Sequence, residues 1–356
     1  MSKICILGAS NIKHISLISL YTKYFDKRKI PYDIIYMDRY GIEEETNAQN
    51  QFCYKSDKIS SKFDKIKAFL GFRRFAKKIL KKNKYQCVIT WQTTSAYLFA
   101  DVLLAKYKHK YIVNVRDYVA ENNKIIRVIL RKLVKEASMV AISSEGFKEF
   151  LPKGDYTRVN SINDNILDNC TPVETLDHVH PYKIGFAGNC RYFRESYKLI
   201  QALANDPRFE IWYCGTNSEV LSRYAAEQDI SNVYTMPAFA PSETLDIFSQ
   251  FDIVNSAFGS DAMDNRTLMP IRLYTAISMH LPMLVSGGTQ LAKEVNLWKI
   301  GFVIEDYSTL AGDLYNYLAS QDKKEFAMAC DKYIEQARRE NELFYKKLGE
   351  IVEETL

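Results

Sequence analysis

The sequence predicts an α/β protein built from two Rossmann-like, doubly wound domains. Short apolar runs alternate with stretches of helical periodicity along most of the chain, and this alternation is typical of a parallel sheet with helices on both faces. With 356 residues, the chain is long enough for two domains that each bury a core. We predict an N-terminal domain over residues 1–176, a C-terminal domain over 182–335 and a C-terminal helix over 336–356.

The first half contains five clear strand signals and one weaker signal. The apolar runs lie at residues 3–7, 32–37, 85–90, 111–115 and 139–143, and the weaker run lies at 156–159. Helical periodicity covers residues 12–29, 94–107 and 124–136. A looser stretch, rich in Asn, Asp and Pro, follows at 160–181 and is typical of an interdomain linker.

Residues 55–84 are strongly basic and amphipathic. They hold 12 Lys and Arg against two Asp, and their apolar residues recur every three or four positions, as on one face of a helix or of two helices broken at Gly71. Such a helix is typical of contact with an anionic membrane surface. We predict that the residues facing the membrane are Lys62, Lys65, Phe69, Arg73, Arg74, Lys77 and Lys78.

Two alternatives to membrane contact exist for this stretch. The first is a solvated basic face whose apolar stripe packs on the sheet. The second is nucleic acid, which the acidic second half and the absence of a recognisable nucleic-acid module disfavour.

Residues 1–180 carry 31 Lys and Arg against 19 Asp and Glu, a net of +12, whereas residues 181–356 carry 17 against 24, a net of −7. This asymmetry indicates different partners for the two halves.

The second half repeats the α/β pattern. We predict strands at 183–187, 209–214, 232–235, 252–256, 282–286 and 301–304. Helices are expected near 196–204, 217–228, 242–250, 270–279, 289–297, 307–319 and 323–356. Pro270 suits the first turn of its helix, where its missing N–H is not needed, and a helix start beside an arginine at strand ends is a place to hold a phosphate.

Composition indicates a reduced, intracellular environment. The seven cysteines are odd in number and include no C-x-x-C pair. No apolar run reaches the length of a membrane span, and the N-terminal residues look like a first strand rather than a signal peptide. We therefore predict a cytoplasmic protein that is peripherally attached to the inner face of the cell membrane.

Five stretches carry a resemblance to a known architecture. They are the loop 188–191 (Gly-Asn-Cys-Arg), the strand and loop 252–264, the segment 270–274 (Pro-Ile-Arg-Leu-Tyr), the run 281–286 (Leu-Pro-Met-Leu-Val-Ser) and, in the first half, residues 140–147. Together they resemble the two-domain GT-B glycosyltransferases, in particular glycosyltransferase family 4 and related capsule or O-antigen transferases.

This resemblance implies two domains facing a cleft, a nucleotide-sugar donor on the C-terminal domain and a last helix that crosses back to the N-terminal domain. It also implies a metal-independent reaction without a cofactor, in which basic side chains and a helix N-terminus stabilise the leaving diphosphate of a UDP- or GDP-linked sugar. The donor-binding residues expected on this basis are Gly188, Asn189, Arg191, Arg194, Arg266, Arg272, Tyr274 and Thr275.

The sequence departs from the family pattern at two positions. Many members have two glutamates eight positions apart, and the matching positions here are Thr267 and Thr275. A threonine hydroxyl cannot accept hydrogen bonds from two ribose hydroxyls as a carboxylate does. Other groups must then contact the ribose, or the nucleotide binds differently.

The acceptor side is expected on the N-terminal domain. Asp117 follows a strand and is the carboxylate best placed to act as a catalytic base, although a helix cap or an ion pair with Arg116 is an alternative role. The turn that contains Gly8, Ser10 and Asn11 would face the same side. This turn lacks the G-x-G-x-x-G pattern, which argues against a dinucleotide dehydrogenase.

We therefore predict a glycosyltransferase that moves a sugar from a nucleotide-sugar donor to a lipid-linked glycan acceptor in bacterial surface polysaccharide synthesis. Its expected partners are the nucleotide sugar, the lipid-linked saccharide and an anionic membrane surface, without nucleic acid. Two alternatives are a non-catalytic GT-B-fold partner of a membrane-associated glycan assembly complex and a GT-B-shaped sugar-nucleotide epimerase.

Overall fold

The computed structural model divides the chain into two compact units. Unit 1 comprises Met1–Asn160 and Glu340–Leu356, and unit 2 comprises Ser161–Arg339. The structure describes residues 3–14, 17–56, 59–119, 121–163, 167, 169–173 and 181–353. The first boundary falls earlier in the chain than the sequence pattern placed it, because Ile162 packs in the core of unit 2 and the Val173 N–H donates to the Met279 carbonyl.

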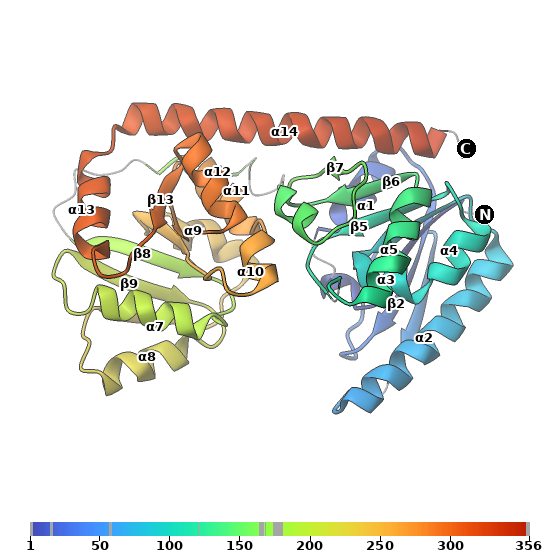
Figure 1. Ribbon diagram of the computed structural model, residues 1–356, viewed down its shortest axis with the longest axis horizontal. Helices are drawn as coiled ribbons and strands as arrows, with labels where there is room; N and C mark the ends of the chain where they lie inside the picture. Colours follow the sequence, from blue (N-terminus) through green and yellow to red (C-terminus); the bar gives the residue numbers. More distant parts are fainter. Residues whose placement is uncertain are drawn as a thin grey trace. The chain divides into compact units, whose positions relative to one another are not determined.

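Among its described residues, unit 1 contains a seven-stranded parallel sheet in the order β3-β2-β1-β4-β5-β6-β7. Its strands are β1 (Ile4–Gly8), β2 (Tyr32–Asp38), β3 (Asn50–Lys55), β4 (Cys87–Trp91), β5 (Tyr111–Val115), β6 (Met139–Ile142) and β7 (Thr157–Arg158). Its helices are η1 (Ile12–His14), α1 (Ser19–Lys27), α2 (Lys62–Asn83), α3 (Gln92–Leu98), α4 (Ala100–Lys106), α5 (Lys124–Glu136) and η2 (Glu145–Glu149). In Figure 1, α2 to α5 lie in front of this sheet.

Unit 2 contains a six-stranded parallel sheet in its described part, in the order β10-β9-β8-β11-β12-β13. Its strands are β8 (Tyr182–Ala187), β9 (Phe209–Cys214), β10 (Val233–Met236), β11 (Ile253–Ser256), β12 (Met283–Ser286) and β13 (Gly301–Ile304). Its helices are α7 (Phe193–Ala202), α8 (Ser218–Glu227), η3 (Pro241–Glu243), α9 (Thr244–Phe248), α10 (Met263–Thr267), α11 (Ile271–Ser278), α12 (Gln290–Trp298) and α13 (Leu310–Ser320). Helices α7, α8 and α13 pack on one face, and α9, α11 and α12 pack on the other.

The last helix, α14 (Lys323–Glu353), contributes to both cores. Phe326, Cys330, Tyr333 and Ala337 from its first part are buried in unit 2. Further along the same helix, three residues are buried in unit 1 against α1 and the sheet, namely Phe344, Leu348 and Val352. Steps of three and four residues in the first set, and of four in the second, keep the apolar side chains of each set on one face of the helix.

A pair of hydrogen bonds joins the two segments of unit 1 where it is interrupted. The Asn160 N–H donates to Asn341 Oδ1 over 2.6 Å, and Asn341 Nδ2 donates to the Asn160 carbonyl over 3.2 Å. Both asparagines are buried, so these bonds satisfy backbone groups that water does not reach.

The prediction of two parallel α/β sheets is confirmed, with corrections to individual elements. The described residues of the predicted helix at 12–29 form η1 and α1, and Leu17 between them has a φ of +60°, so the two are separate helices. The edge strand β3 and the short α10 lie where the sequence pattern predicted neither. The predicted break at Gly71 is wrong, because α2 runs without interruption through this residue. A Cβ at Gly71 would lie 1.9 Å from Tyr54 Oη, so the glycine makes room for that ring.

In the part of the chain that the structure describes, we find no helix long and apolar enough to cross a membrane.

Candidate donor-binding site

Two glycines hold the loops after β8 and β9 close together. The Gly188 N–H donates to the Cys214 carbonyl over 2.8 Å, and the Cys190 N–H donates to the Thr216 carbonyl over 2.9 Å. Gly215 has a φ of +135°, and a Cβ added there would lie 1.9 Å from the Gly188 carbonyl oxygen. Only glycine combines this conformation with this close approach, so the residue fixes the shape of the strand-end loops.

Arg272 reaches these loops from the first turn of α11. Pro270 is the N-cap of that helix, which places Arg272 where backbone N–H groups lack helical partners. Arg272 Nη1 donates to the Asn255 carbonyl over 3.4 Å. A Cβ added at Gly188 would lie 3.1 Å from Arg272 Nη2, so the structure brings these two predicted donor-binding residues together.

The Arg272 guanidinium lies against two aromatic rings. Its Cζ is 4.0 Å from the Phe186 ring centroid and 5.3 Å from the Phe258 centroid. Burial lowers the pKa of Arg272 to about 10, because a low-dielectric surrounding disfavours the charged form. No described residue forms an ion pair with it, so the site holds a partly buried cation without a carboxylate partner among the described residues.

A second arginine continues this stack outward. Tyr192 and Phe258 stack with centroids 4.4 Å apart. The Arg191 guanidinium lies 5.0 Å from the Tyr192 centroid, and its Nη2 donates to the Tyr192 hydroxyl over 2.7 Å. The stacked pair of Phe258 and Tyr192 therefore carries one arginine against each ring, an arrangement that pre-orients guanidinium groups for an anion.

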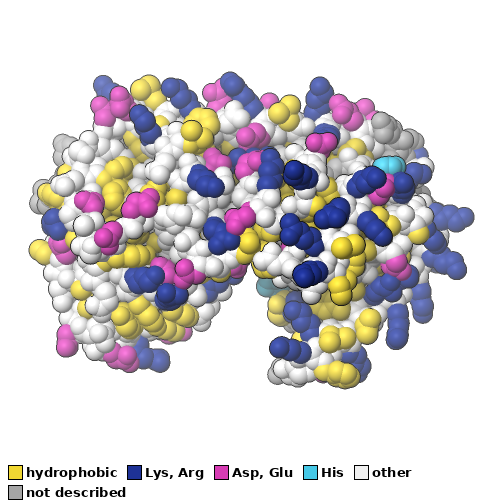
Figure 2. Space-filling view, viewed as in Figure 1, with side chains coloured by type: hydrophobic (Ala, Val, Ile, Leu, Met, Phe, Trp, Pro, Cys, Tyr) yellow, Lys and Arg dark blue, Asp and Glu magenta, His cyan; other side chains and the backbone are white. Residues whose placement is uncertain are grey.

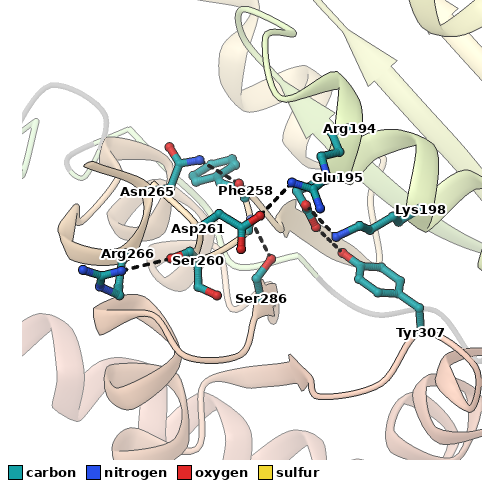
Figure 3. Close-up of polar contacts among 11 residues, drawn as sticks. Arg194, Glu195, Lys198, Phe258, Ser260, Asp261, Asn265, Arg266, Ser286 and Tyr307 are labelled. Atoms are coloured by element: carbon teal, nitrogen blue, oxygen red, sulfur yellow. Dashed lines mark hydrogen bonds and ion pairs between the residues drawn. The ribbon is translucent and has the colours of Figure 1, made fainter. Parts of the chain in front are cut away.

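The other predicted arginines make local contacts. Arg194 forms an exposed ion pair with Asp261 (Nη1 to Oδ2, 2.7 Å), and Arg266 Nη1 donates to the Ser260 carbonyl over 3.4 Å. Figure 3 shows the Arg194 and Asp261 side chains pointing toward one another across the loop after β11. Asn189 Oδ1 accepts a hydrogen bond from Asn217 Nδ2 over 3.0 Å, so it ties the loops after β8 and β9 together.

A carboxylate that the sequence reasoning missed lies next to this loop. Glu195 accepts hydrogen bonds from Lys198 Nζ over 2.8 Å and from the Tyr307 hydroxyl over 3.3 Å (Figure 3). It also packs on Gly259, whose N–H donates to Ser286 Oγ over 2.9 Å. Glu195 stands in the first turn of α7, and its position directly after a strand-end loop is the signal that could have identified it.

Phe186 and Phe258 were also missed. Each lies at or just beyond the carboxyl end of a strand, β8 or β11. Residues in that position face ligands in open α/β sheets, but an aromatic residue there has the same sequence signal as a core residue.

The two threonines that the sequence comparison matched to family 4 glutamates are buried. Thr267 is fully buried, and its hydroxyl donates to the Met263 carbonyl over 2.7 Å. Thr275 is buried in the core of unit 2 beside Tyr274, which stacks on Tyr333 with centroids 6.3 Å apart. Neither Tyr274 nor Thr275 has exposed surface for a nucleotide.

The predicted acceptor-side residues lie in unit 1. Gly8 ends β1, and Ser10 follows it, half-buried. Asn11 Nδ2 donates to Asp38 Oδ1 over 2.7 Å, and Asn11 Oδ1 accepts from the Arg39 N–H over 2.8 Å. The amide of Asn11 therefore connects the ends of β1 and β2.

The carboxylate of Asp38 is held ionised. Burial raises its pKa, but hydrogen bonds from Asn11 and from three backbone N–H groups outweigh this and lower the pKa below its usual value. Asp117 is exposed and directly follows the buried Arg116, whose Cζ is 5.3 Å from the Trp91 ring.

Two parallel, doubly wound units define the fold as GT-B, the architecture that the sequence predicted. A sucrose-phosphate synthase from Thermosynechococcus elongatus superposes with a TM-score of 0.75 at 12% identity, over 99% of each chain. HepE of Anabaena, solved in complex with UDP, gives a TM-score of 0.68 at 12% identity over 98% of this chain and 100% of HepE. WaaG, a glycosyltransferase involved in lipopolysaccharide biosynthesis, gives 0.63 at 11% identity over 94% of this chain and 95% of WaaG.

No protein-family model matches the chain, and no curated protein matches it. At identities this low, the structural superpositions establish a shared fold and nothing more. The activity must be argued from the site.

Proposed function

We propose that this protein is a glycosyltransferase that binds a nucleotide-sugar donor on unit 2. The observation that carries the proposal is the Arg272 guanidinium, which lies between Phe186 and Phe258 next to Gly188 without a carboxylate partner among the described residues. A desolvated cation is costly unless a counter-charge is supplied. The diphosphate of a nucleotide sugar would supply it, and HepE, which shares the fold, was solved with UDP and with UDP-glucose.

In this proposal the arginines act on the leaving group. As the bond between the sugar and the diphosphate breaks, negative charge develops on the diphosphate oxygen. Arg272, with Arg191 on the outer side of the stack, would stabilise that charge through bidentate hydrogen bonds. The backbone N–H groups in the first turn of α11 would contribute in the same direction. Asp117 of unit 1 remains our proposed base for the acceptor hydroxyl.

We further propose that the acceptor is a lipid-linked saccharide and that unit 1 docks on an anionic membrane, as an enzyme of bacterial surface polysaccharide synthesis would. Three apolar residues of α2 follow one another at helical spacing and are exposed: Phe63 by 75%, Ile66 by 58% and Leu70 by 49%. Lys62 and Lys65 flank them and are also exposed. Exposed apolar side chains among cations fit a lipid interface, where the apolar groups enter the headgroup region.

The two ends of α2 differ in their contacts. Arg73 and Lys77 both pair with Asp101 of α4, at 2.7 and 2.9 Å, so they attach the helix to unit 1. Phe69 is half-buried, whereas Arg74 and Lys78 are exposed. Figure 2 shows Lys and Arg side chains gathered over α2 and α5. We therefore propose that the first turns of α2, rather than its whole length, contact the membrane.

The decisive experiment measures donor binding and turnover separately. The protein would be titrated with UDP and GDP by calorimetry, and then incubated with UDP- and GDP-linked sugars and a bacterial lipid extract while nucleoside diphosphate release is followed. We expect one nucleotide to bind and its sugar to be consumed only with the extract present. Absence of binding by any nucleotide would refute the proposal.

Thr267 and Thr275 favour a second candidate, a non-catalytic GT-B-fold partner in a glycan assembly complex. Both residues are buried, and neither is a carboxylate that could contact a sugar or a ribose. A nucleotide that binds without any sugar being consumed would select this second candidate.

A further inference from the structure

A basic pocket opens in unit 1, away from the strand ends that carry the predicted acceptor residues. It lies at the amino end of β6, between the second half of α5, the segment before β7 and the last part of α14, and has a volume of about 420 Å³. The polar side chains that line it are Arg131, Lys135, Ser138, Lys153, Asp155 and Lys347. Four cations thus share this space with one carboxylate.

These cations form no ion pair within the described part of the chain, although the pKa of the neighbouring Glu136 is lowered by a hydrogen bond from Lys108 and also by the Lys135 charge. Arg131, Lys135 and Lys153 form no ion pair there, and neither does Asp155. Lys347 donates to the uncharged Thr157 hydroxyl over 3.2 Å. Like charges gathered around one cavity raise its positive potential, which attracts an anion.

A second basic pocket in unit 1 provides a contrast. It lies between α2 and α4 and includes Lys77, Lys78 and Asp101. There, Asp101 already pairs with Lys77 and with Arg73, so part of the positive charge is neutralised by the protein itself. The pocket at β6 has no such pairing among the described residues.

A hydroxyl at the same pocket also lacks a partner. Ser138 Oγ is buried and makes no hydrogen bond to any described residue. Buried polar groups are nearly always satisfied, and a hydroxyl can donate to a phosphate oxygen. Three cations outside ion pairs and an unsatisfied hydroxyl together offer charged and neutral donors of the kind that bind a phosphate group.

We propose that this pocket binds a phosphate group, with Arg131, Lys135 and Lys153 as its counter-charges. The site is separate from the donor site on unit 2, and the inference does not depend on glycosyl transfer. The phosphate could belong to a soluble phosphate compound or to a phospholipid headgroup. Val128, one turn before Arg131 on α5, is 52% exposed, so an apolar side chain lies along the helix from the pocket.

The test uses the full chain and three probes: inorganic phosphate, glycerol 1-phosphate, and phosphatidylcholine vesicles with or without phosphatidylglycerol. The pocket variant carries Arg131→Gln and Lys153→Gln. A charge-matched control carries Arg127→Gln and Lys132→Gln, which are exposed residues of α5 outside the pocket. Thermal melts would check that both variants fold like the parent protein.

We expect the pocket variant to bind the phosphate probes at least about tenfold more weakly, and the control to stay within about twofold, because charged hydrogen bonds require the pocket geometry. A phospholipid source predicts that vesicle binding falls in the pocket variant and that glycerol 1-phosphate competes with it. A soluble source predicts unchanged vesicle binding together with loss of binding to the soluble probes. Equal losses in both variants, or no saturable binding of any probe by the parent protein, would overturn the proposal.

Discussion

Replacing Arg272 by glutamine should make the ligand-free protein more stable and should lower its affinity for a nucleotide. The partly buried guanidinium lies against Phe186 and Phe258 and has no ion-pair partner among the described residues. A residue kept for binding rather than for folding is expected to behave in this way, because its charge is compensated only when the ligand is present.

The size of both effects can be worked out from the structure. A pKa of about 10 in place of 12.5 corresponds to roughly 3 kcal/mol against the charged form. Cation–π contacts with the two rings stabilise the charged form by about 2 kcal/mol. The glutamine variant should therefore gain about 1 kcal/mol, which raises Tm by about 2–4 °C in a unit of this size. Loss of charged hydrogen bonds, about 1.5–3 kcal/mol, should weaken nucleoside diphosphate binding roughly 10- to 150-fold.

Scanning calorimetry of the ligand-free protein and titration calorimetry with UDP and GDP would measure the two effects. Arg194→Gln is the matched control, because Arg194 is an exposed arginine whose ion pair with Asp261 contributes little stability. Arg272→Lys should keep part of the affinity, since it keeps the charge but loses the planar fork. A lower Tm together with unchanged nucleotide affinity in Arg272→Gln would refute the reasoning.

Three further substitutions test separate parts of unit 1. Gly71→Ala should destabilise it by about 1–3 kcal/mol in urea unfolding, because the new Cβ meets Tyr54; a gain in stability, as at an open helix position, would contradict this packing. Asn341→Ala should cost about 2–3 kcal/mol, since buried backbone groups of Asn160 lose their partner; a cost below about 0.5 kcal/mol would show that water replaces the asparagine. The folded-state pKa of Asp38 lies below the usual 3.8, so its contribution to stability is complete above about pH 4 and is lost as the pH falls through the folded-state value. Asp38→Asn should flatten the pH dependence of Tm below pH 4, and parallel curves for the two proteins would rule this out.

The elements that the sequence predicted well have strong apolar runs. The strand predicted at 209–214 coincides with β9, and that predicted at 111–115 with β5, because strands buried on both faces are predominantly apolar. The edge strand β3 escaped notice, since its exposed Asn50 and Gln51 give it no apolar pattern. At Gly71 helix propensity pointed to a break, but close packing on Tyr54 accounts for the glycine.

The candidate site was predicted only in part, for a physical reason. Arg272 could be identified because a proline, an arginine and a following strand mark a helix start at the sheet edge. Phe186 and Phe258 could not be identified, because an aromatic residue at a strand end has the same sequence signal as a core residue. The burial of Thr267 and Thr275 depends on how α10 and α11 pack, and a single sequence carries no information on that.

The last helix, which contributes to both cores, constrains the order in which the two units can fold during synthesis. Residues 340–353 of α14 leave the ribosome after every strand of unit 2, yet Phe344, Leu348 and Val352 complete the core of unit 1. Unit 2 can therefore assemble first during synthesis, whereas unit 1, whose strands emerge earlier, keeps an apolar face uncovered until translation reaches this segment. A nascent chain in that interval needs protection from aggregation. A premature stop codon near residue 340 would damage the N-terminal unit rather than the unit whose coding sequence it follows.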